Sequence, residues 1–473
     1  MADTTLNHSR RDFLKTMGLA LAGYSIAGCN GISNILSGRA KSKRPNIIFI
    51  FADDWGWGDL SCHGHPDIKT PNLDRLASQG TEFYQFTVNG SVCSPSRTAV
   101  ITGHFPARHR VHQHFAKHED NLARGMPDWL DPNVVTLPRL LKQVGYKTAH
   151  YGKWHLTNNF IKNPPTPLEY GYDDAKTWNP TWVSVWQGRE RPADYNKKYH
   201  HAYQTKGAVN CAIDFIHEHT EKPFFINLWI HETHTPFSPT PSQRQAYKDY
   251  PEPQQTYYSA VTNADRQIGK LLDMLDESGL TENTMVIFSS DNGPERTGPK
   301  RNKKLGDGLG TYYSVGSTAG LKGRKRSLFE GGIRLPFIVR WPGKTPVGKI
   351  DKTSVITGVD LLPSFCNIAG VKLPTDYKPD GEDITAALLG KPIIRDKPIF
   401  WEWRGSEQEN NWPRLAIRDG DYKLVMTFDQ KRIELYDLAH DREEKYNLAE
   451  RMPKKVVELK VKLLVWKKTL PID

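Results

Sequence analysis

The segment Pro45-Asn46-Ile47-Ile48-Phe49-Ile50-Phe51-Ala52-Asp53-Asp54 contains six apolar residues in a row with no polar interruption. A strand with one exposed face would alternate apolar and polar residues. An unbroken run therefore indicates a strand buried on both faces, as in a parallel sheet covered by helices on each side. The run ends in two adjacent carboxylates, Asp53 and Asp54, so it also predicts a polar group at the end of a buried strand.

Three more buried strands follow along the chain, each preceded by a segment with helical periodicity. The strands are predicted at 148–153, 224–231 and 285–292, and the helices at 137–143, 208–217 and 264–277. Alternation of helix and buried strand predicts an α/β fold with a large mixed, mostly parallel sheet flanked by helices.

Polar side chains with ligand chemistry follow all four predicted strands: Asp53, Asp54, Lys153, His155, His234, Asp291 and Asn292. In open α/β sheets, ligands bind beyond the carboxyl ends of the strands, so these side chains are expected to converge. Any one of them alone is more typical of a loop cap or a surface charge. Asp53, Asp54, Asp291 and Asn292 form an all-oxygen set, which favours a hard cation, Ca²⁺ or alternatively Mg²⁺, over zinc.

The pentapeptide Cys93-Ser94-Pro95-Ser96-Arg97 is the second feature that indicates function. One interpretation is a buried structural thiol before a helix, with Ser94 as its cap and Pro95 in the first turn. The alternative is an anion site, because Arg97 lies four residues after Cys93, near the open amides of a helix N-terminus.

This pentapeptide and its Thr-Ala-x-x-Thr-Gly continuation resemble the signature of the formylglycine-dependent sulfatases of the alkaline phosphatase superfamily. The resemblance implies that Cys93 is oxidised to 3-oxoalanine (formylglycine) by a formylglycine-generating maturation enzyme. The hydrate of that aldehyde is the nucleophile in the family. It also implies an alkaline phosphatase-like fold and hydrolysis of a sulfate ester.

Further roles follow from the same resemblance. Residues 145–156 are similar to the second family signature, which gives Lys153 a role in binding sulfate and His155 a contact with the nucleophile. The segment His234-Thr235-Pro236 is similar to the family's His-x-Pro element, so His234 is a predicted sulfate ligand and leaving-group acid. Lys325, five residues before Glu330, is similar to the lysine shared between sulfate and the leaving oxygen, although Lys322 lies in the same basic segment.

Two alternatives remain open at this stage. Phosphomonoester, phosphodiester or phosphonate hydrolases share the superfamily, since one fold hosts several chemistries. A lipid-anchored protein that binds sulfated glycans without catalysis is the other alternative. The expected substrate is a sulfated carbohydrate. His112, His114, Trp182, Trp186, Trp401 and Trp403 are candidate sugar contacts, although such aromatics are more typical of a core.

The net charge of +11 is compatible with an acidic partner. No nucleic-acid motif or zinc-ligand spacing accompanies it, so nucleic acid is not an expected partner.

Residues 1–29 are predicted to be an export signal, with a twin-arginine pattern at Arg10 and Arg11 and a lipobox ending at Cys29. An ordinary cleaved signal is the alternative. The first interpretation predicts a periplasmic or cell-surface lipoprotein anchored to the membrane at Cys29.

The last part of the chain has a different pattern. Residues 416–425 predict a hairpin around Asp419-Gly420, and residues 456–466 predict a basic amphipathic helix. We therefore expect a catalytic domain at 45–350 and a smaller antiparallel subdomain with a closing helix at 351–473. The five cysteines are widely spaced and do not form a disulfide framework.

Overall fold

The computed structural model describes residues 44–177, 184, 190–191, 193, 197–300, 310–405 and 412–471. The predicted export signal with Cys29 lies outside the described residues, as do Trp182 and Trp186. Within the described part of the chain, no helix has both the length and the apolar character needed to cross a membrane.

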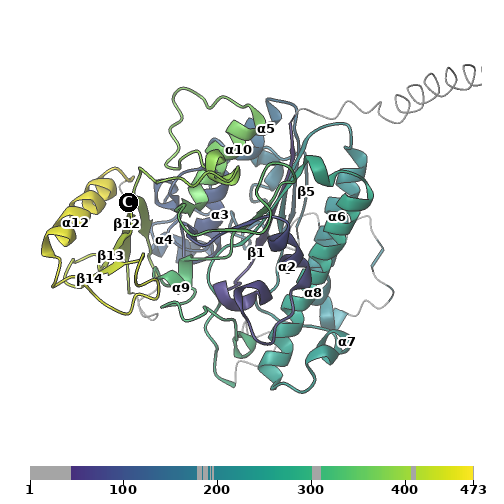
Figure 1. Cartoon of the computed structure of the whole chain (residues 1–473), viewed down its shortest axis with the longest axis horizontal. Coiled ribbons are helices and arrows are strands. Elements are labelled where there is room, and N and C mark those ends of the chain that lie inside the picture. Colours follow the sequence, from purple (N-terminus) through teal and green to yellow (C-terminus); the bar gives the residue numbers. More distant parts are fainter. Residues whose placement is uncertain are drawn as a thin grey trace, which may run out of the picture. The chain divides into compact units, whose positions relative to one another are not determined.

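Eight strands of the described residues form one sheet, in the order β5-β4-β6-β1-β7-β8-β2-β9. Figure 1 labels β1 and β5 of this sheet. Only β8 runs antiparallel to its neighbours, β7 and β2, and the other neighbouring strands pair in parallel. This confirms the predicted mixed, mostly parallel sheet. The strands are β1 (Asn46–Ala52), β2 (Thr81–Phe83), β4 (Lys147–Gly152), β5 (Asp174–Thr177), β6 (Phe224–Trp229), β7 (Thr284–Ser290), β8 (Ile338–Arg340) and β9 (Lys349–Asp351).

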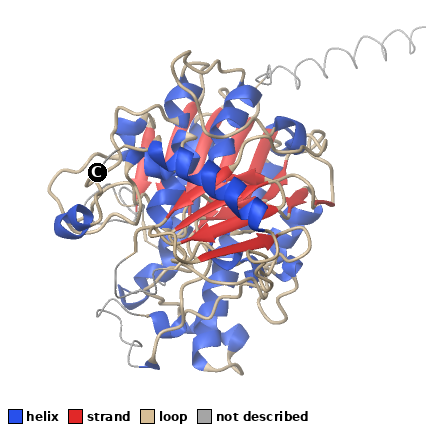
Figure 2. Ribbon diagram, turned by 90° about the vertical axis from the view of Figure 1, so that its left-hand side faces the viewer, coloured by secondary structure: helices blue, strands red, loops and turns tan. Residues whose placement is uncertain are grey.

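β1 lies between β6 and β7 in the sheet, and both of its faces are covered, as its unbroken apolar run predicts. Ile48 and Ile50 face one core, and Ile47, Phe49 and Phe51 face the other. Figure 2 shows the strands lying between helices. Helices α2 (Pro71–Ser78), α6 (Gln204–Glu218) and α8 (Glu252–Glu277) contribute to the first core, and α3 (Cys93–Thr102), α5 (Leu137–Lys142) and α10 (Leu361–Ala369) contribute to the second.

Short elements complete the connections. They are α4 (His118–Ala123), α7 (Pro241–Arg244), α9 (Glu330–Ile333), α11 (Thr385–Leu388), the single-turn 3₁₀ helices η1 (Trp57–Asp59) and η2 (Ser61–His63), and the paired strands β3 (Phe86–Thr87) and β10 (Ile356–Thr357). Helix α8 begins at Glu252, earlier than the segment predicted from residue 264. Its first turns include Pro253, Gln254 and Gln255, which give little apolar periodicity.

A separate antiparallel sheet follows near the C-terminus, in the order β11-β12-β13-β14. It comprises β11 (Ile399–Glu402), β12 (Leu415–Asp419), β13 (Tyr422–Met426) and β14 (Ile433–Asp437), with α12 (Pro453–Lys468) against it. β12 and β13 form the predicted hairpin.

The expected domain boundary at residue 350 falls inside β9, because this strand extends the large sheet. The residues after β9 still add β10 and α10 to the catalytic part, and the separate sheet starts only at Ile399.

Candidate active site

The carboxyl ends of β1 and β7 bring four oxygen-bearing side chains together. Ala52 of β1 pairs with Ser290 of β7, so Asp53 and Asp54 leave the sheet beside Asp291 and Asn292. Asn292 Nδ2 donates to Asp54 Oδ1 at 2.6 Å, and the Asp54 amide donates to Asp291 Oδ1 at 3.3 Å. All four side chains are buried. The structure therefore assembles the predicted metal ligands at one edge of the sheet.

Helix α3 brings Cys93 and Arg97 to the same point, since residues four apart share a helix face. Cys93 Sγ lies 3.6 Å from Asp53 Oδ1. Arg97 is fully buried, with Nη2 2.6 Å from Asp291 Oδ2 and its guanidinium carbon 4.9 Å from the centre of the Trp229 ring. Ser94 is not the helix cap considered above, because α3 starts at Cys93 itself. Its hydroxyl instead donates to the backbone oxygen of His155.

Lys153 reaches the cluster from the end of β4. Its Nζ lies 2.6 Å from Asp53 Oδ2 and 3.1 Å from Cys93 Sγ. Gly152 allows this approach, because its φ is 106° and a Cβ there would come within 2.0 Å of the Trp229 carbonyl oxygen. The close passage of β4 against β6 thus fixes where Lys153 leaves the strand.

Lys325 completes the cluster, and Lys322 does not take part. Lys325 Nζ lies 2.6 Å from Asp54 Oδ2. Lys322 Nζ instead donates to the Tyr436 hydroxyl at 2.7 Å and lies over the Phe329 ring. Lys322 therefore contacts the C-terminal sheet, and the spacing argument for Lys325 agrees with the geometry.

The cluster contains three carboxylates and three cations. Burial, and then the mutual repulsion of Asp53 and Asp291, raise the pKa of Asp291. Burial raises the pKa of the Cys93 thiol to about 12, although Lys153 opposes this. The unmodified thiol is thus protonated near neutral pH and is a weak nucleophile.

The donor set fits a hard divalent cation. Oxygen atoms of Asp53, Asp54 and Asp291, together with Cys93 Sγ, lie within 4.8 Å of one another. Asn292 Oδ1 is buried and has no hydrogen-bond partner among the described residues, which suits an oxygen that faces a cation.

Two predicted histidines lie at the border of this cluster. His234 Nδ1 donates to the Thr235 carbonyl oxygen at 2.6 Å, which leaves Nε2 as the bare nitrogen. Burial, followed by Lys153 and Lys325, holds the pKa of His234 well below its usual value. His155 Nε2 donates to the Phe115 carbonyl oxygen, and its buried Nδ1 has no partner among the described residues.

Two further residues lie at the site that the sequence did not indicate. His231 Nδ1 lies 3.8 Å from Asp53 Oδ2, and its ring centre is 5.6 Å from that of His234. Glu295 lies 3.6 Å from Lys325 Nζ and 2.5 Å from Arg326. The only indication in the sequence is their nearness to predicted site residues. His231 lies three residues before His234, and Glu295 lies four residues after Asp291. The sugar-contact candidates Trp401 and Trp403 are instead buried in the core.

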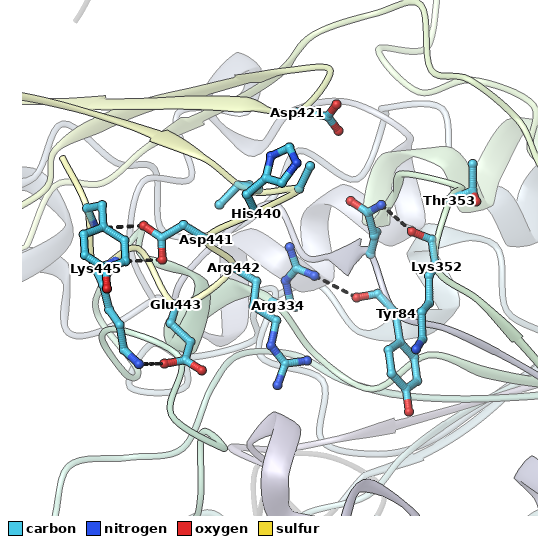
Figure 3. A pocket seen from close by; sticks show the side chains of 14 residues that line it. Tyr84, Arg334, Lys352, Thr353, Asp421, His440, Asp441, Arg442, Glu443 and Lys445 are labelled. Atoms are coloured by element: carbon cyan, nitrogen blue, oxygen red, sulfur yellow. Dashed lines mark hydrogen bonds and ion pairs between the residues drawn. The ribbon is translucent and has the colours of Figure 1, made fainter. Parts of the chain in front are cut away.

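A pocket of about 770 Å³ lies apart from these residues (Figure 3). Tyr84 and Lys352, which follow β2 and β9, line it together with Arg334 and residues 438–443, and no predicted catalytic or metal residue does so. In Figure 3, the guanidinium groups of Arg334 and Arg442 lie near Tyr84. The buried cluster, and not this open pocket, carries the chemistry that the sequence predicts.

Residues 45–371 match the family model for sulfatases, and residues 323–469 match the model described as N-sulphoglucosamine sulphohydrolase, C-terminal. The chain therefore belongs to the sulfatase family of the alkaline phosphatase superfamily, and it is a sulfuric ester hydrolase. This membership favours the sulfatase interpretation over the phosphohydrolase and non-catalytic alternatives.

Similar proteins agree with this assignment. The chain is 32% identical over 408 residues to N-acetylgalactosamine-6-sulfatase of Canis lupus familiaris, covering 80% of this chain and 71% of that protein. It is 30% identical over 526 residues to N-acetylgalactosamine-6-O-sulfatase of Bacteroides thetaiotaomicron, covering 93% and 96%. A structure from work on glycosaminoglycan metabolism by Bacteroides thetaiotaomicron superimposes with a TM-score of 0.72 at 26% identity, covering 90% of this chain and all of that one.

Proposed function

We propose that this sulfatase hydrolyses a sulfate ester on a carbohydrate, with oxidised Cys93 as the source of the nucleophile and a divalent cation at Asp53, Asp54, Asp291 and Asn292. One observation carries the proposal. The Cys93 thiol lies within 3.6 Å of Asp53 and 3.1 Å of Lys153, at the centre of a hard-cation donor set. The names of the similar proteins support a sulfated sugar as substrate, and N-acetylgalactosamine-6-sulfate is the first compound to test.

The required modification is a two-electron oxidation at the Cys93 side chain. The carbon–sulfur bond is replaced by a carbon–oxygen double bond, sulfur leaves as hydrogen sulfide, and water supplies the oxygen. A maturation enzyme with an external electron acceptor takes up the two electrons and two protons. The hydrated aldehyde supplies one hydroxyl for attack on sulfur and a second hydroxyl for release of sulfate.

The cation is Ca²⁺ or Mg²⁺, both of which bind oxygen ligands. Once bound, it supplies positive charge to the sulfate oxygens and to the nucleophile. Arg97 holds Asp291 in position through two donated hydrogen bonds to Oδ2. Lys153, between Asp53 and Cys93, is placed to bind a sulfate oxygen.

Two residues are available for the leaving oxygen. Burial lowers the pKa of Lys325, but the Asp54 carboxylate raises this pKa above its usual range. Lys325 is therefore protonated in the resting site. His234 Nε2 is bare in that state, and it becomes an acid only once a bound anion raises its pKa. Lys325 and His234 are therefore both proposed to serve the leaving oxygen, Lys325 by its charge in the resting site and His234 as the acid once the substrate anion is bound. We assign His155 to contact with the modified side chain at residue 93, because the family resemblance gives it that role and its buried Nδ1 has no hydrogen-bond partner among the described residues.

The primary experiment measures sulfate released from N-acetylgalactosamine-6-sulfate and a panel of sulfated oligosaccharides. Peptide mass spectrometry on the same preparation should show that residue 93 has lost sulfur and gained a carbonyl oxygen. Asp291→Ala should remove both bound metal and turnover. Full turnover with an unmodified thiol at residue 93, or in protein shown to be metal-free, would refute the respective part of the proposal.

We also propose export by the twin-arginine route and a lipid anchor at Cys29. The pattern at Arg10 and Arg11 and the small residues before Cys29 support this. Replacing both arginines by lysine should trap the precursor in the cytoplasm, and Cys29→Ala should yield soluble product. Export of the double-lysine variant at the wild-type level would refute the route.

A further inference from the structure

A second group of metal-ligating side chains lies outside the active site, at Cys62, His63 and Glu82. Cys62 and His63 belong to η2, and Glu82 is the middle residue of β2. One ligand atom from each lies within 4.8 Å of those of the other two. Thiol, imidazole and carboxylate form a mixed set, unlike the all-oxygen set of the active site.

Both ring nitrogens of His63 lie at hydrogen-bond distance from an oxygen atom. Its Nδ1 lies 2.7 Å from the Trp57 carbonyl oxygen, which can only accept, so Nδ1 carries the proton. Its Nε2 lies 2.8 Å from Glu82 Oε2. In the neutral ring, this nitrogen presents a lone pair to a carboxylate oxygen. A second proton would join these two atoms in a hydrogen-bonded ion pair at this distance, whereas a cation bound to both would replace that proton and move the two atoms apart.

The surroundings favour the cation. A backbone carbonyl that receives the proton of one ring nitrogen is the usual device that aims the other nitrogen at a metal. The imidazole is held in place by the Trp57 ring, which stacks on it at 4.4 Å between centroids. Without a metal ion the Cys62 thiol is hydrogen-bonded to Asp74, whereas a metal ion would take the Cys62 sulfur as a third ligand beside His63 and Glu82.

We propose that Cys62, His63 and Glu82 bind a zinc-class divalent ion that fastens η1 and η2 to β2. Zinc accepts nitrogen, sulfur and carboxylate ligands together, and three protein ligands leave a fourth position for water. Burial, and then Glu82, raise the pKa of the Cys62 thiol, so the incoming ion displaces a proton. Cys62 is only half-buried, and Tyr84, which lines the pocket of Figure 3, meets the His63 ring edge-on.

The ion would act on the loop that follows the active-site carboxylates. η1 begins three residues after Asp54, and Asp59 at its end accepts hydrogen bonds from the Gly56 amide and the Tyr257 hydroxyl. The proposed site is therefore structural, and it does not depend on the proposed catalytic chemistry. Its ligands differ in softness from those of the active site, so the two sites select different ions.

Cobalt binding tests the proposal, because a cobalt–thiolate bond gives a near-ultraviolet charge-transfer band that oxygen ligands alone cannot give. Wild-type protein titrated with Co²⁺ should show the band at one equivalent. Cys93→Ser is the matched control, since its thiol lies in the other cluster, and it should keep the band. Cys62→Ser should abolish it and weaken Zn²⁺ binding by roughly tenfold or more.

Glu82→Gln provides a second variant should Cys62→Ser fail to fold, and it should weaken Zn²⁺ binding in the same way. Zn²⁺ should raise the melting temperature of the wild type but not of either variant, while sulfatase turnover stays near the wild-type level. A cobalt band that persists in Cys62→Ser, or Zn²⁺ affinity unchanged in both variants, would overturn the proposal.

Discussion

At the residue scale, the active site depends on charges held at fixed short distances. Lys153, Arg97 and Lys325 each lie 2.6 Å from a different buried carboxylate. Charge-assisted pairs of this kind set orientation as well as electrostatics. Each cation is therefore held in a defined direction, and removing one should affect a particular step of the proposed reaction.

We predict that His234→Ala and Lys153→Ala differ in their dependence on the leaving group. A sugar oxygen needs protonation far more than a nitrophenolate does. His234→Ala should therefore reduce hydrolysis of a sugar sulfate much more than that of nitrophenyl sulfate, with each tenfold difference worth about 1.4 kcal/mol. Lys153→Ala should reduce both alike. If His234→Ala lowered kcat/KM equally for the sugar sulfate and for nitrophenyl sulfate, His234 would not be the acid, and Lys325 would be the remaining candidate.

Asp59 should make stability depend on pH. Burial raises its pKa to about 6, although hydrogen bonds from Ser317, Gly56 and Tyr257 oppose this. Because the folded-state pKa lies above the unfolded value of 3.8, the folded protein loses stability as pH rises through this window. Relative to Asp59→Asn, the wild type should lose on the order of 2 to 3 kcal/mol between about pH 4 and pH 7. Denaturation curves of both proteins across this range check the prediction, which a pH-independent difference would contradict.

At the element scale, the ends of the strands decide which side chains reach the site. β4 must pass close to β6 before Lys153 can turn toward Asp53, and a glycine stands at this point. Gly152 has a φ of 106°, which residues with a Cβ rarely adopt. The geometry of one strand end therefore controls the position of Lys153, the proposed sulfate-binding lysine.

Gly152→Ala should lower both stability and turnover. The added Cβ would meet the Trp229 carbonyl oxygen at 2.0 Å, so the strand must shift and Lys153 moves with it. Gly145→Ala is the matched control, because Gly145 also has a positive φ but has no atom within 4 Å of an added Cβ. We expect the control to cost only about 1 kcal/mol of backbone strain and to keep turnover. Similar kcat values for the two variants would show that the close passage does not position Lys153.

At the scale of the whole molecule, the C-terminal sheet is joined to the catalytic part by buried charge. Lys423 of β13 lies 2.8 Å from Glu330 of α9 and 3.0 Å from Glu444, and all three side chains are inaccessible to solvent. The sheet also contributes Trp401 and Leu424 to the same core as α3. The two parts should therefore unfold together.

Lys423→Met should destabilise the protein by roughly 3 to 5 kcal/mol, because it leaves the buried carboxylate of Glu444 without its cation and Glu330 with Arg334 alone. Lys445→Met is the control, since Lys445 pairs with Glu443 at the surface, where solvent screens the two charges. Calorimetry should show one transition for each protein, with a large shift only for Lys423→Met. Equal shifts, or a separate early transition in the wild type, would argue against the buried junction.

The sequence alone predicted the sheet and the cluster of polar side chains beyond its strand ends, because both depend on local patterns. The run at Ile47–Ala52 had to be buried on both faces, and the polar residues after each strand had to meet at one edge. The resemblance around Cys93 implied which side chain is the proposed nucleophile.

Only the tertiary structure decided which side chains outside those patterns reach the same places. His231 and Glu295 join the active site through loop geometry that leaves no periodic trace. Cys62 and His63 meet Glu82, 19 residues after His63, because β2 lies beside η2, and no sequence spacing indicates this. Long-range packing, which follows no short-range pattern, fixed these contacts and the late start of the C-terminal sheet.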